Sequence, residues 1–335
     1  MSPDTLPQEM TAVAISTPGP PDVLLPVRRP LPSPHAGEVL IRVAAAGVNR
    51  PDLLQRLGKY PAPPGASDLP GLEVAGHVVG LGEGVSWPAI GMRVAALLSG
   101  GGYAEYCTAR AAHCLVVPDS LPLAEAAALP EAIFTVWVNV FDLGRLAFGE
   151  HLLVHGGASG IGSTATRMAK AFGARVAVTA SGPARTEACR ALGADLAVDY
   201  QSQDFVGAVR EWTNGRGVDV ILDMVGGSYL ARNLDALAEG GRLVQIAILG
   251  GARGEVNLLK VMQKRLTLTG STLRSRDDAF KARVCGAVAE QVWPHVVAGR
   301  IRPVIHATFP LAEAARAHTA LETGGHVGKV VLLVE

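Results

Sequence analysis

The chain has 335 residues, which is long enough for about two domains that each bury a core. Its 30 Lys and Arg residues balance its 30 Asp and Glu residues, so the charge does not favour nucleic acid or an anionic membrane as a partner. The 49% of hydrophobic residues and the 39 glycines are typical of a compact α/β protein.

The N-terminus and the cysteines predict a cytoplasmic protein. Residues 1–4 lack the basic and apolar regions of a signal peptide, and no apolar run approaches the ~18 residues that a transmembrane helix needs. The four cysteines are scattered without C-x-x-C spacing, so we expect reduced thiols and neither a structural zinc nor a disulfide framework.

Short strands dominate the first part of the chain. Apolar stretches between Gly and Pro clusters predict strands at 11–16, 39–45, 73–81, 93–98, 103–108 and 114–117. A proline-rich connection joins the first two, and the whole pattern is typical of an irregular β-barrel. Helices predicted at 123–129 and 133–143 lead out of the β region, so we place a domain boundary near Pro130.

The segment 151–163 predicts a strand, a glycine turn and a helix. Leu152, Leu153 and Val154 form the apolar run of a buried strand, and a second β-like segment at 175–179 completes a βαβ unit of roughly 30 residues. The turn matches G-x-G-x-x-G except that Ser159 replaces the middle glycine. Because the helix N-terminus presents free N–H groups, we predict a dinucleotide site. The alternative is a glycine turn that only packs helix on strand.

Helices and strands continue to alternate up to residue 270. Helices are predicted at 186–192, 205–213, 229–238 and 258–264, and strands at 196–198, 218–222, 242–248 and 266–270. This pattern predicts a doubly wound parallel sheet over 131–272. Helices at 279–298 and 311–321 and a strand at 329–334 follow, and we expect residues 273–335 to return to the domain formed by 1–130.

Several strings resemble the medium-chain dehydrogenase/reductase superfamily, in particular its zinc-free quinone oxidoreductases related to zeta-crystallin, of the tumour-suppressor-inducible NADPH quinone oxidoreductase type. They are Asn49–Tyr60, Pro63–Ser67, Leu129–Ala132, Asp223–Tyr229 and Leu273–Asp277. The resemblance implies a GroES-like catalytic domain, a central Rossmann domain and NADPH in the cleft between them. Zinc alcohol dehydrogenases have a cysteine ligand where this chain has Val48-Asn49, and a histidine ligand where it has Leu72, so the resemblance implies no metal.

The resemblance also suggests three catalytic residues. It places Asn49 and Thr135 beside the nicotinamide, and the alternative for each is a helix-capping role. Tyr60 lies in a loop rich in Gly and Pro, where its phenol could stack on a planar substrate and hydrogen-bond a quinol oxygen, or serve only as a lid. We interpret His77 as a packed or surface histidine and Lys329 as a solvated charge.

The expected cofactor contacts follow the predicted strands. Backbone around Ser159, Gly160, Ile161 and Gly162 should meet the diphosphate, with the Ser159 hydroxyl able to donate to it. No acid follows the strand at 175–179, so Ser181 and Arg185 should bind the 2′-phosphate of NADPH, and Tyr200 could cover the same pocket. Further contacts after parallel strands are expected at Val225, Gly226, Ala247, Ile248, Leu249, Ser271, Thr272 and Leu273.

Together these features predict a metal-free NADPH:quinone oxidoreductase that acts on a quinone or another planar electrophile. Relatives suggest a homodimer through edge strands of the Rossmann sheet. One alternative is an NADPH-dependent enone or alkenal reductase. The other is a nucleotide-binding protein with little turnover, crystallin-like or RNA-binding, although neutral charge and the lack of an aromatic-basic stripe argue against RNA.

Overall fold

The computed structural model describes residues 6–334, which form two compact units. The first unit holds residues up to 131 together with 274–290 and from 305 onward, and the second holds 132–273 and 291–304. Residues 291–304 therefore group with the second unit, whereas the sequence analysis assigned all of 273–335 to the first.

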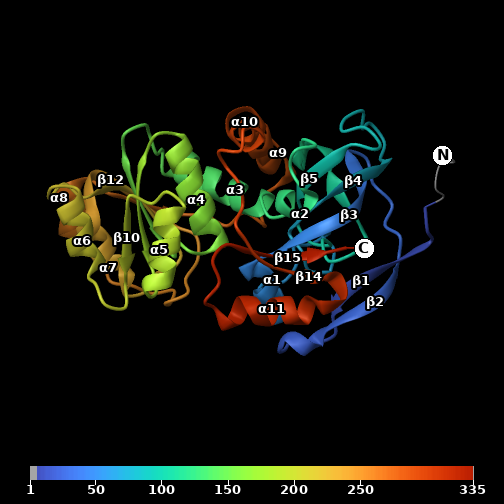
Figure 1. The fold of residues 1–335 in the computed structure, drawn as a ribbon, viewed down its shortest axis with the longest axis horizontal. Helices are drawn as coiled ribbons and strands as arrows, with labels where there is room; N and C mark the ends of the chain where they lie inside the picture. The colour runs from blue at the N-terminus through green and yellow to red at the C-terminus, as the bar shows by residue number, and fades with distance from the viewer. Residues whose placement is uncertain (1–5, 335) are drawn as a thin grey trace. The chain divides into compact units, whose positions relative to one another are not determined.

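A parallel six-stranded sheet forms the centre of the second unit, in the order β10-β9-β8-β11-β12-β13. The strands are β8 (His151–His155), β9 (Arg175–Ala180), β10 (Leu196–Asp199), β11 (Val218–Asp223), β12 (Leu237–Gln245) and β13 (Thr267–Gly270). Its helices are α4 (Gly160–Ala171), α5 (Pro183–Ala191), α6 (Phe205–Trp212), α7 (Tyr229–Ala236), α8 (Leu258–Lys264) and α10 (Trp293–Val297). Figure 1 shows α4 and α5 on one side of this sheet and α6, α7 and α8 on the other, which is the doubly wound arrangement.

The strand β8 occupies a central position because both of its faces are apolar. Leu152, Leu153 and Val154 are fully buried, as are Ala165 and Met168 on the facing side of α4. Ser159 is the N-cap of α4, so the glycine turn ends where the helix begins. This confirms the strand, turn and helix that the sequence predicts for 151–171, while β12 begins at Leu237, within the stretch predicted as helix.

A long helical run connects the strands of the first unit to β8. It consists of α2 (Leu123–Ala126), α3 (Pro130–Val136) and the π-helical segment η3 (Trp137–Leu143). The run Leu123–Leu143 is long and apolar enough to cross a membrane, which differs from the sequence expectation, but 72% of its apolar 18-residue stretch is buried within the protein. Such burial is what a core helix of a folded domain shows.

The first unit contains a seven-stranded sheet and a separate antiparallel pair, β1 with β2. The strands are β1 (Glu9–Ile15), β2 (Leu24–Pro30), β3 (Glu38–Val48), β4 (Glu73–Leu81), β5 (Arg93–Leu97), β6 (Tyr106–Arg110), β7 (Cys114–Val116), β14 (Ile305–Pro310) and β15 (Lys329–Leu333). The helical segments are η1 (Pro21–Val23), α1 (Arg50–Arg56), η2 (Ala111–His113), α9 (Asp278–Ala287), η5 (Leu311–Glu313) and α11 (Ala314–Thr323), and η4 (Val288–Val292) crosses the boundary between the two units. The core of this unit includes Val39, Ile41, Val74, Val94 and Leu332.

Two strands of the first unit were not predicted. The prolines in this region predict a connection, yet β2 pairs along its whole length with β1, with Val13 opposite Pro26. Because β2 pairs with β1 only, a proline in β2 breaks no hydrogen bonds to a strand on its other side. The other, β14, is the edge strand beside β15 and also ends in a proline.

Candidate active site

The turn between β8 and α4 is tight and leaves its backbone accessible. A Cβ on Gly157 would lie 2.5 Å from Cβ of Val178, and one on Gly162 would lie 2.3 Å from the Gly156 carbonyl oxygen, so neither position accepts a side chain. Gly160 and Ile161 remain partly exposed at the helix N-terminus. These features fit the diphosphate of a dinucleotide, which binds backbone N–H groups at such a terminus.

The Ser159 hydroxyl differs from the sequence expectation. It donates to the Gly156 carbonyl oxygen at 2.8 Å and accepts from the Gly162 amide at 3.0 Å. The hydroxyl that was expected to donate to the diphosphate therefore closes the turn instead. The Ser159 amide also donates to the Gly156 carbonyl oxygen, at 3.0 Å, so both donors of this residue serve the turn.

A buried polar chain braces the carboxyl ends of three neighbouring strands. Asn233 Nδ2 donates to Asp223 at 2.9 Å, so its Oδ1 is free to accept from His155 Nε2 at 2.8 Å. His155 Nδ1 then accepts from the Thr179 hydroxyl at 3.0 Å, and burial lowers the pKa of this imidazole, which keeps it neutral. Asp223 in turn accepts from the Val225 amide at 2.6 Å, which fixes a predicted cofactor contact.

The turns after β11 and β12 pack against each other. Gly226 has φ +66°, and a Cβ there would lie 2.8 Å from the Gly251 carbonyl oxygen. The Leu249 amide donates to the Met224 carbonyl oxygen at 3.1 Å. Ile248 and Leu249 are 56% and 58% exposed, so the structure leaves apolar surface uncovered where a dinucleotide contact was predicted.

Asn139 links two of the predicted site residues and was not itself predicted. Its Nδ2 donates to the Thr135 carbonyl oxygen at 2.8 Å, and its Oδ1 accepts from the Ser271 hydroxyl at 2.8 Å. Asn139 is 1% exposed and lies in the π-helical segment η3, a type of segment found frequently at functional sites. No spacing rule identifies this side chain from the sequence.

The residues expected at the 2′-phosphate lie around the turn between β9 and α5. Arg185 Nε donates to the Ser181 carbonyl oxygen at 2.8 Å, and no carboxylate forms an ion pair with this guanidinium among residues 6–334. The Tyr200 amide donates to the Ala180 carbonyl oxygen at 3.1 Å, and its side chain is 44% exposed. The three residues are therefore close in the fold although 19 residues of sequence separate Ser181 from Tyr200.

In the first unit, the side chain of Asn49 is fully engaged by neighbours. Its backbone amide donates to Asp52 Oδ2 at 2.7 Å, which makes Asn49 the N-cap of α1. Its Nδ2 donates to Glu73 Oε1 at 2.9 Å, and its Oδ1 accepts from Lys329 Nζ at 2.5 Å. Asn49 therefore occupies the N-cap position, while its carboxamide is held by Glu73 and Lys329.

Lys329 is not the solvated charge that the sequence analysis expected. It is 5% exposed, and its Nζ also donates to Glu73 Oε1 at 2.5 Å. The other Glu73 oxygen accepts from the Glu131 amide at 2.9 Å. Asn49, Glu73 and Lys329, which we call the buried triad, thus join β3, β4 and β15 with one ion pair and satisfied hydrogen bonds.

Arg274 anchors the loop that carries Tyr60. Its guanidinium donates to the Ser99 carbonyl oxygen at 3.0 Å, to the Tyr60 carbonyl oxygen at 3.3 Å and to Gln55 Oε1 at 2.8 Å. It also lies over the Tyr60 ring, 5.5 Å from the centroid. Lys281 Nζ donates to the Arg274 carbonyl oxygen at 2.9 Å and is itself buried. One buried cation therefore contacts Tyr60 and a second buried cation braces the first, and all of the named acceptors are uncharged.

Burial shifts the pKa values of the acids near this loop. Burial, together with the charge of Glu73, raises the pKa of Glu131 to about 8. The pKa of Tyr60 is also raised by burial and by the charge of Glu131, while Arg274 opposes the shift. Tyr60 is therefore a protonated phenol near neutral pH and can donate a hydrogen bond.

A second buried chain holds α1 against α11. An arginine cannot accept a hydrogen bond, so Arg56, 3.4 Å from His318 Nδ1, must donate to it. His318 Nε2 therefore carries the proton and donates to the Tyr103 hydroxyl at 3.0 Å, which donates to Asp52. Burial lowers the pKa of His318 to about 3 and raises that of Asp52 to about 6. This chain fixes the helix that begins after Asn49.

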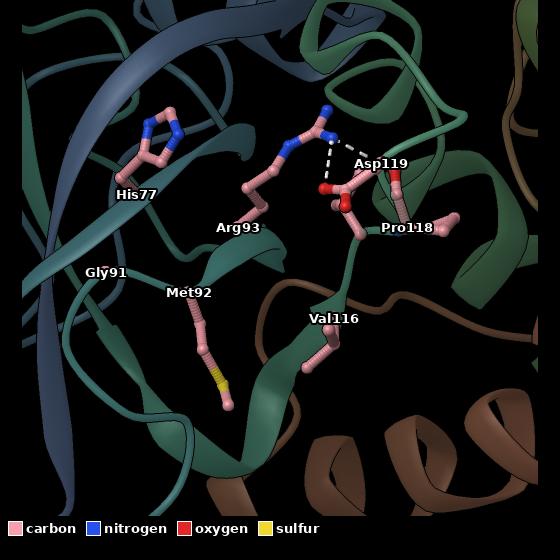
Figure 2. Close-up of a pocket in the computed structure, with 8 residues that line it drawn as sticks. His77, Gly91, Met92, Arg93, Val116, Pro118 and Asp119 are labelled. Carbon is pink, nitrogen blue, oxygen red and sulfur yellow. Dashed lines mark hydrogen bonds and ion pairs between the residues drawn. The ribbon is translucent and has the colours of Figure 1, made fainter.

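A separate surface hollow of about 460 Å³ lies in the first unit, and Figure 2 shows its lining residues. His77 lies at one side, and Arg93 donates to the Pro118 carbonyl oxygen and to Asp119, each at 3.2 Å. None of the predicted site residues lines it. Within residues 6–334, no group of three His, Cys, Asp or Glu residues could hold a metal ion.

Comparison with known proteins identifies the family. Residues 35–119 match the family described as alcohol dehydrogenase GroES-like domain, and residues 192–332 match the one described as zinc-binding dehydrogenase. The quinone oxidoreductase of Rattus norvegicus is 31% identical over 331 residues, which are 97% of this chain and 98% of that protein. The chain belongs to the medium-chain dehydrogenase/reductase family. The first unit of this dehydrogenase/reductase is thus GroES-like, and the second is its Rossmann domain.

Other members of the family differ in size and cofactor. The mycocerosic acid synthase-like polyketide synthase of Mycobacterium tuberculosis is 32% identical over 303 residues, which are 89% of this chain but only 14% of that protein. A structure described as an NAD-dependent alcohol dehydrogenase has 32% identity and a TM-score of 0.86, covering 97% of this chain and all of that one. A mycobacterial protein solved in complex with NADPH has 32% identity and a TM-score of 0.85, covering 97% and 99%. The dehydrogenase/reductase is therefore an oxidoreductase that uses a nicotinamide cofactor.

Proposed function

We propose that this protein is an NADPH-dependent quinone oxidoreductase that works without a catalytic metal. The observation that carries the proposal is the buried triad. Asn49 takes the position of a zinc ligand in zinc alcohol dehydrogenases, and its side chain is held by Glu73 and Lys329 rather than left to coordinate an ion. Leu72 takes the position of the second ligand. The groups near the Tyr60 phenol are Arg274 and the Glu131 carboxyl, whose pKa is raised to about 8.

The cofactor assignment has support from the Rossmann domain. Arg185 has its guanidinium without an ion-pair partner in the described chain, and a 2′-phosphate would supply that partner. The relative solved with NADPH is 32% identical, and so is the structure described as NAD-dependent. Sequence identity therefore does not distinguish the two cofactors, and the assignment of NADPH rests on the side chains at this turn.

The proposed hydride transfer requires that the cofactor is held in position and that the negative charge gained by the substrate oxygen is stabilised. When bound, the nicotinamide supplies a hydride to the quinone. The backbone at 160–162 holds the diphosphate, and Asn139 fixes Thr135 and Ser271 relative to each other. Tyr60 donates a hydrogen bond to the substrate oxygen that gains negative charge, and the charge of Arg274 beside the ring stabilises it. A quinone fits because its reduction places charge on oxygen.

A panel of acceptors tests the proposal. NADPH oxidation is followed with ortho-quinones, para-quinones, enones and alkenals, each with and without the protein. The proposal predicts faster oxidation with at least one quinone than with any enone or alkenal. If an enone or alkenal were the better acceptor, the protein would be a double-bond reductase instead. If NADPH bound and no acceptor responded, the oxidoreductase proposal for this pair of substrates would fail.

We also propose a cytoplasmic homodimer formed through the free edge of the Rossmann sheet. The edge strand β13 has no neighbour beyond it among the described residues, and Leu268 on it is 37% exposed. Leu258, Leu259 and Met262 on the adjoining helix α8 are 70%, 58% and 73% exposed. Such an apolar surface beside an unpaired edge favours association. Sedimentation equilibrium should give twice the mass of the chain, and a monomer at micromolar concentration would refute this.

A further inference from the structure

The turn between β9 and α5 contains no acidic residue, but an aspartate from a neighbouring strand contacts it. Strand β10 pairs with β9 so that Asp199 lies opposite Ala180, the last residue of β9. The carboxylate of Asp199 reaches the turn directly, because the Gly182 amide donates to its Oδ1 at 2.9 Å. No acidic residue directly follows β9 in the sequence, but a carboxylate from the adjacent strand β10 therefore lies at the turn.

Three hydrogen bonds fix this carboxylate. Besides Gly182, the Gln201 amide donates to Oδ1 at 3.1 Å, and the Ser202 hydroxyl donates to Oδ2 at 3.1 Å. These bonds, that of Gly182 most of all, lower the pKa of Asp199. The side chain is therefore a fixed negative charge at neutral pH.

Arg185 and Asp199 share the same turn without forming an ion pair. Arg185 Nε donates to the Ser181 carbonyl oxygen at 2.8 Å, which directs the guanidinium along the turn. The charge of Arg185 is among the causes that lower the pKa of Asp199, so the two groups act on each other. A phosphate bound by Arg185 would meet the field of Asp199 as well.

We propose that Asp199 is a specificity-determining residue that limits the preference of this site for the 2′-phosphate of NADPH over the hydroxyl of NADH. The inference rests on the proposed nucleotide binding at this turn and extends it. Asp199 has two separable effects: its oxygen braces the Gly182 amide, which serves both nucleotides, and its charge opposes the phosphate alone. A 2′-phosphate carries about two negative charges, whereas a hydroxyl carries none.

The size of the effect follows from Coulomb's law. Charges at a solvated surface that lie within the Debye length, about 8 Å at physiological salt, change an affinity by about two- to tenfold. The effect should therefore decrease as the salt concentration rises. The hydrogen bond from the Gly182 amide to Asp199 does not depend on salt in this way, because both groups belong to the protein.

The test uses Asp199→Asn, which keeps the Oδ1 acceptor for Gly182 and Gln201 and removes the charge. Dissociation constants of NADPH and NADH are measured by nucleotide fluorescence, and that of 2′,5′-ADP by competition, with no hydride acceptor present. We expect NADPH and 2′,5′-ADP to bind about two- to tenfold more tightly than to the unmodified protein, with NADH unchanged. Asp195→Asn is the matched control, because it removes one charge about 13 Å away at the other end of β10. It should change the NADPH to NADH ratio by much less.

Two results would overturn the inference. An equal change for NADPH and NADH in Asp199→Asn would show that the residue acts only as a brace. Weaker NADPH binding in that variant would show that the carboxylate supports Arg185 rather than opposing the phosphate. The proposed function fails separately: nucleotides would then bind with these preferences, yet no quinone would accelerate NADPH oxidation. If neither nucleotide bound the unmodified protein, both proposals would be wrong.

Discussion

Replacement of Lys329 by methionine tests whether the buried triad holds the first unit together. Methionine has about the length of the lysine stem but no charge and no donor, so the variant removes two hydrogen bonds of 2.5 Å, to Glu73 and to Asn49. Glu73 is fully buried and would keep only the Asn49 side chain and the Glu131 amide as donors. The substitution therefore leaves a carboxylate in the interior without its counter-charge.

Breaking a buried ion pair in this way costs about 3–5 kcal/mol, because the remaining charge is desolvated and unpaired. Changing both Glu73 and Lys329 is expected to lower the free energy of unfolding by much less. In the double variant Glu73→Gln/Lys329→Met no net charge is buried, and the Gln carbonyl oxygen can still accept from Asn49 or Glu131. The two variants together separate the charge from the hydrogen bonds.

Urea unfolding measures the predicted loss, with the unmodified protein, the single variant and the double variant compared at the same pH. We expect Lys329→Met to lower the free energy of unfolding by about 3–5 kcal/mol and the double variant to recover more than half of that. A loss below about 1 kcal/mol in the single variant, the range of an exposed ion pair, would refute the reasoning. So would a double variant that is less stable than the single one.

Three further predictions concern individual side chains. Arg185→Ala should weaken NADPH about tenfold to a hundredfold, the loss of a charged hydrogen bond of ~1.5–3 kcal/mol, and leave NADH nearly unchanged in the same titration; equal losses would show that Arg185 does not bind the phosphate. Tyr60→Phe should lower kcat/KM for a quinone about tenfold or more while the dissociation constant of NADPH stays constant, and unchanged kinetics would leave Tyr60 as a lid only. The pKa of Glu131 is raised from 4.5 to about 8, so the folded state binds the proton more tightly and loses stability as the pH rises through that window. The Tm advantage of Glu131→Gln over the unmodified protein should therefore be larger at pH 8.5 than at pH 5, and an equal difference at both would contradict the shift.

Local patterns were sufficient to predict the Rossmann domain. The run Leu152–Val154 is buried on both faces, and Ser159 directly before the first helical residue is a capping signal, so the strand, turn and helix follow from neighbouring residues. The strand β2 was missed because local patterns do not show which strands pair. Prolines are strand-breaking by local criteria, and only the pairing with β1 shows that this strand is an edge.

The site residues that were missed depend on contacts between distant parts of the chain. Lys329 and Glu73 are 256 residues apart in sequence, so a lone lysine near the C-terminus gives no sign of burial. Asp199 reaches the Gly182 amide only because β10 lies beside β9 in a particular register. Asn139 contacts Ser271, which is 132 residues away in sequence. Glu73, directly after the position of a missing metal ligand, was the one signal that could have led to the buried triad.

The function we propose is hydride transfer from NADPH to a quinone without a metal. The most direct measurement is the rate of NADPH oxidation by the best quinone of the panel, before and after prolonged dialysis against a chelator, with metal analysis of the same sample. Metal-free hydride transfer predicts an unchanged rate and no stoichiometric zinc. A rate that falls on chelation and returns when zinc is added would contradict it.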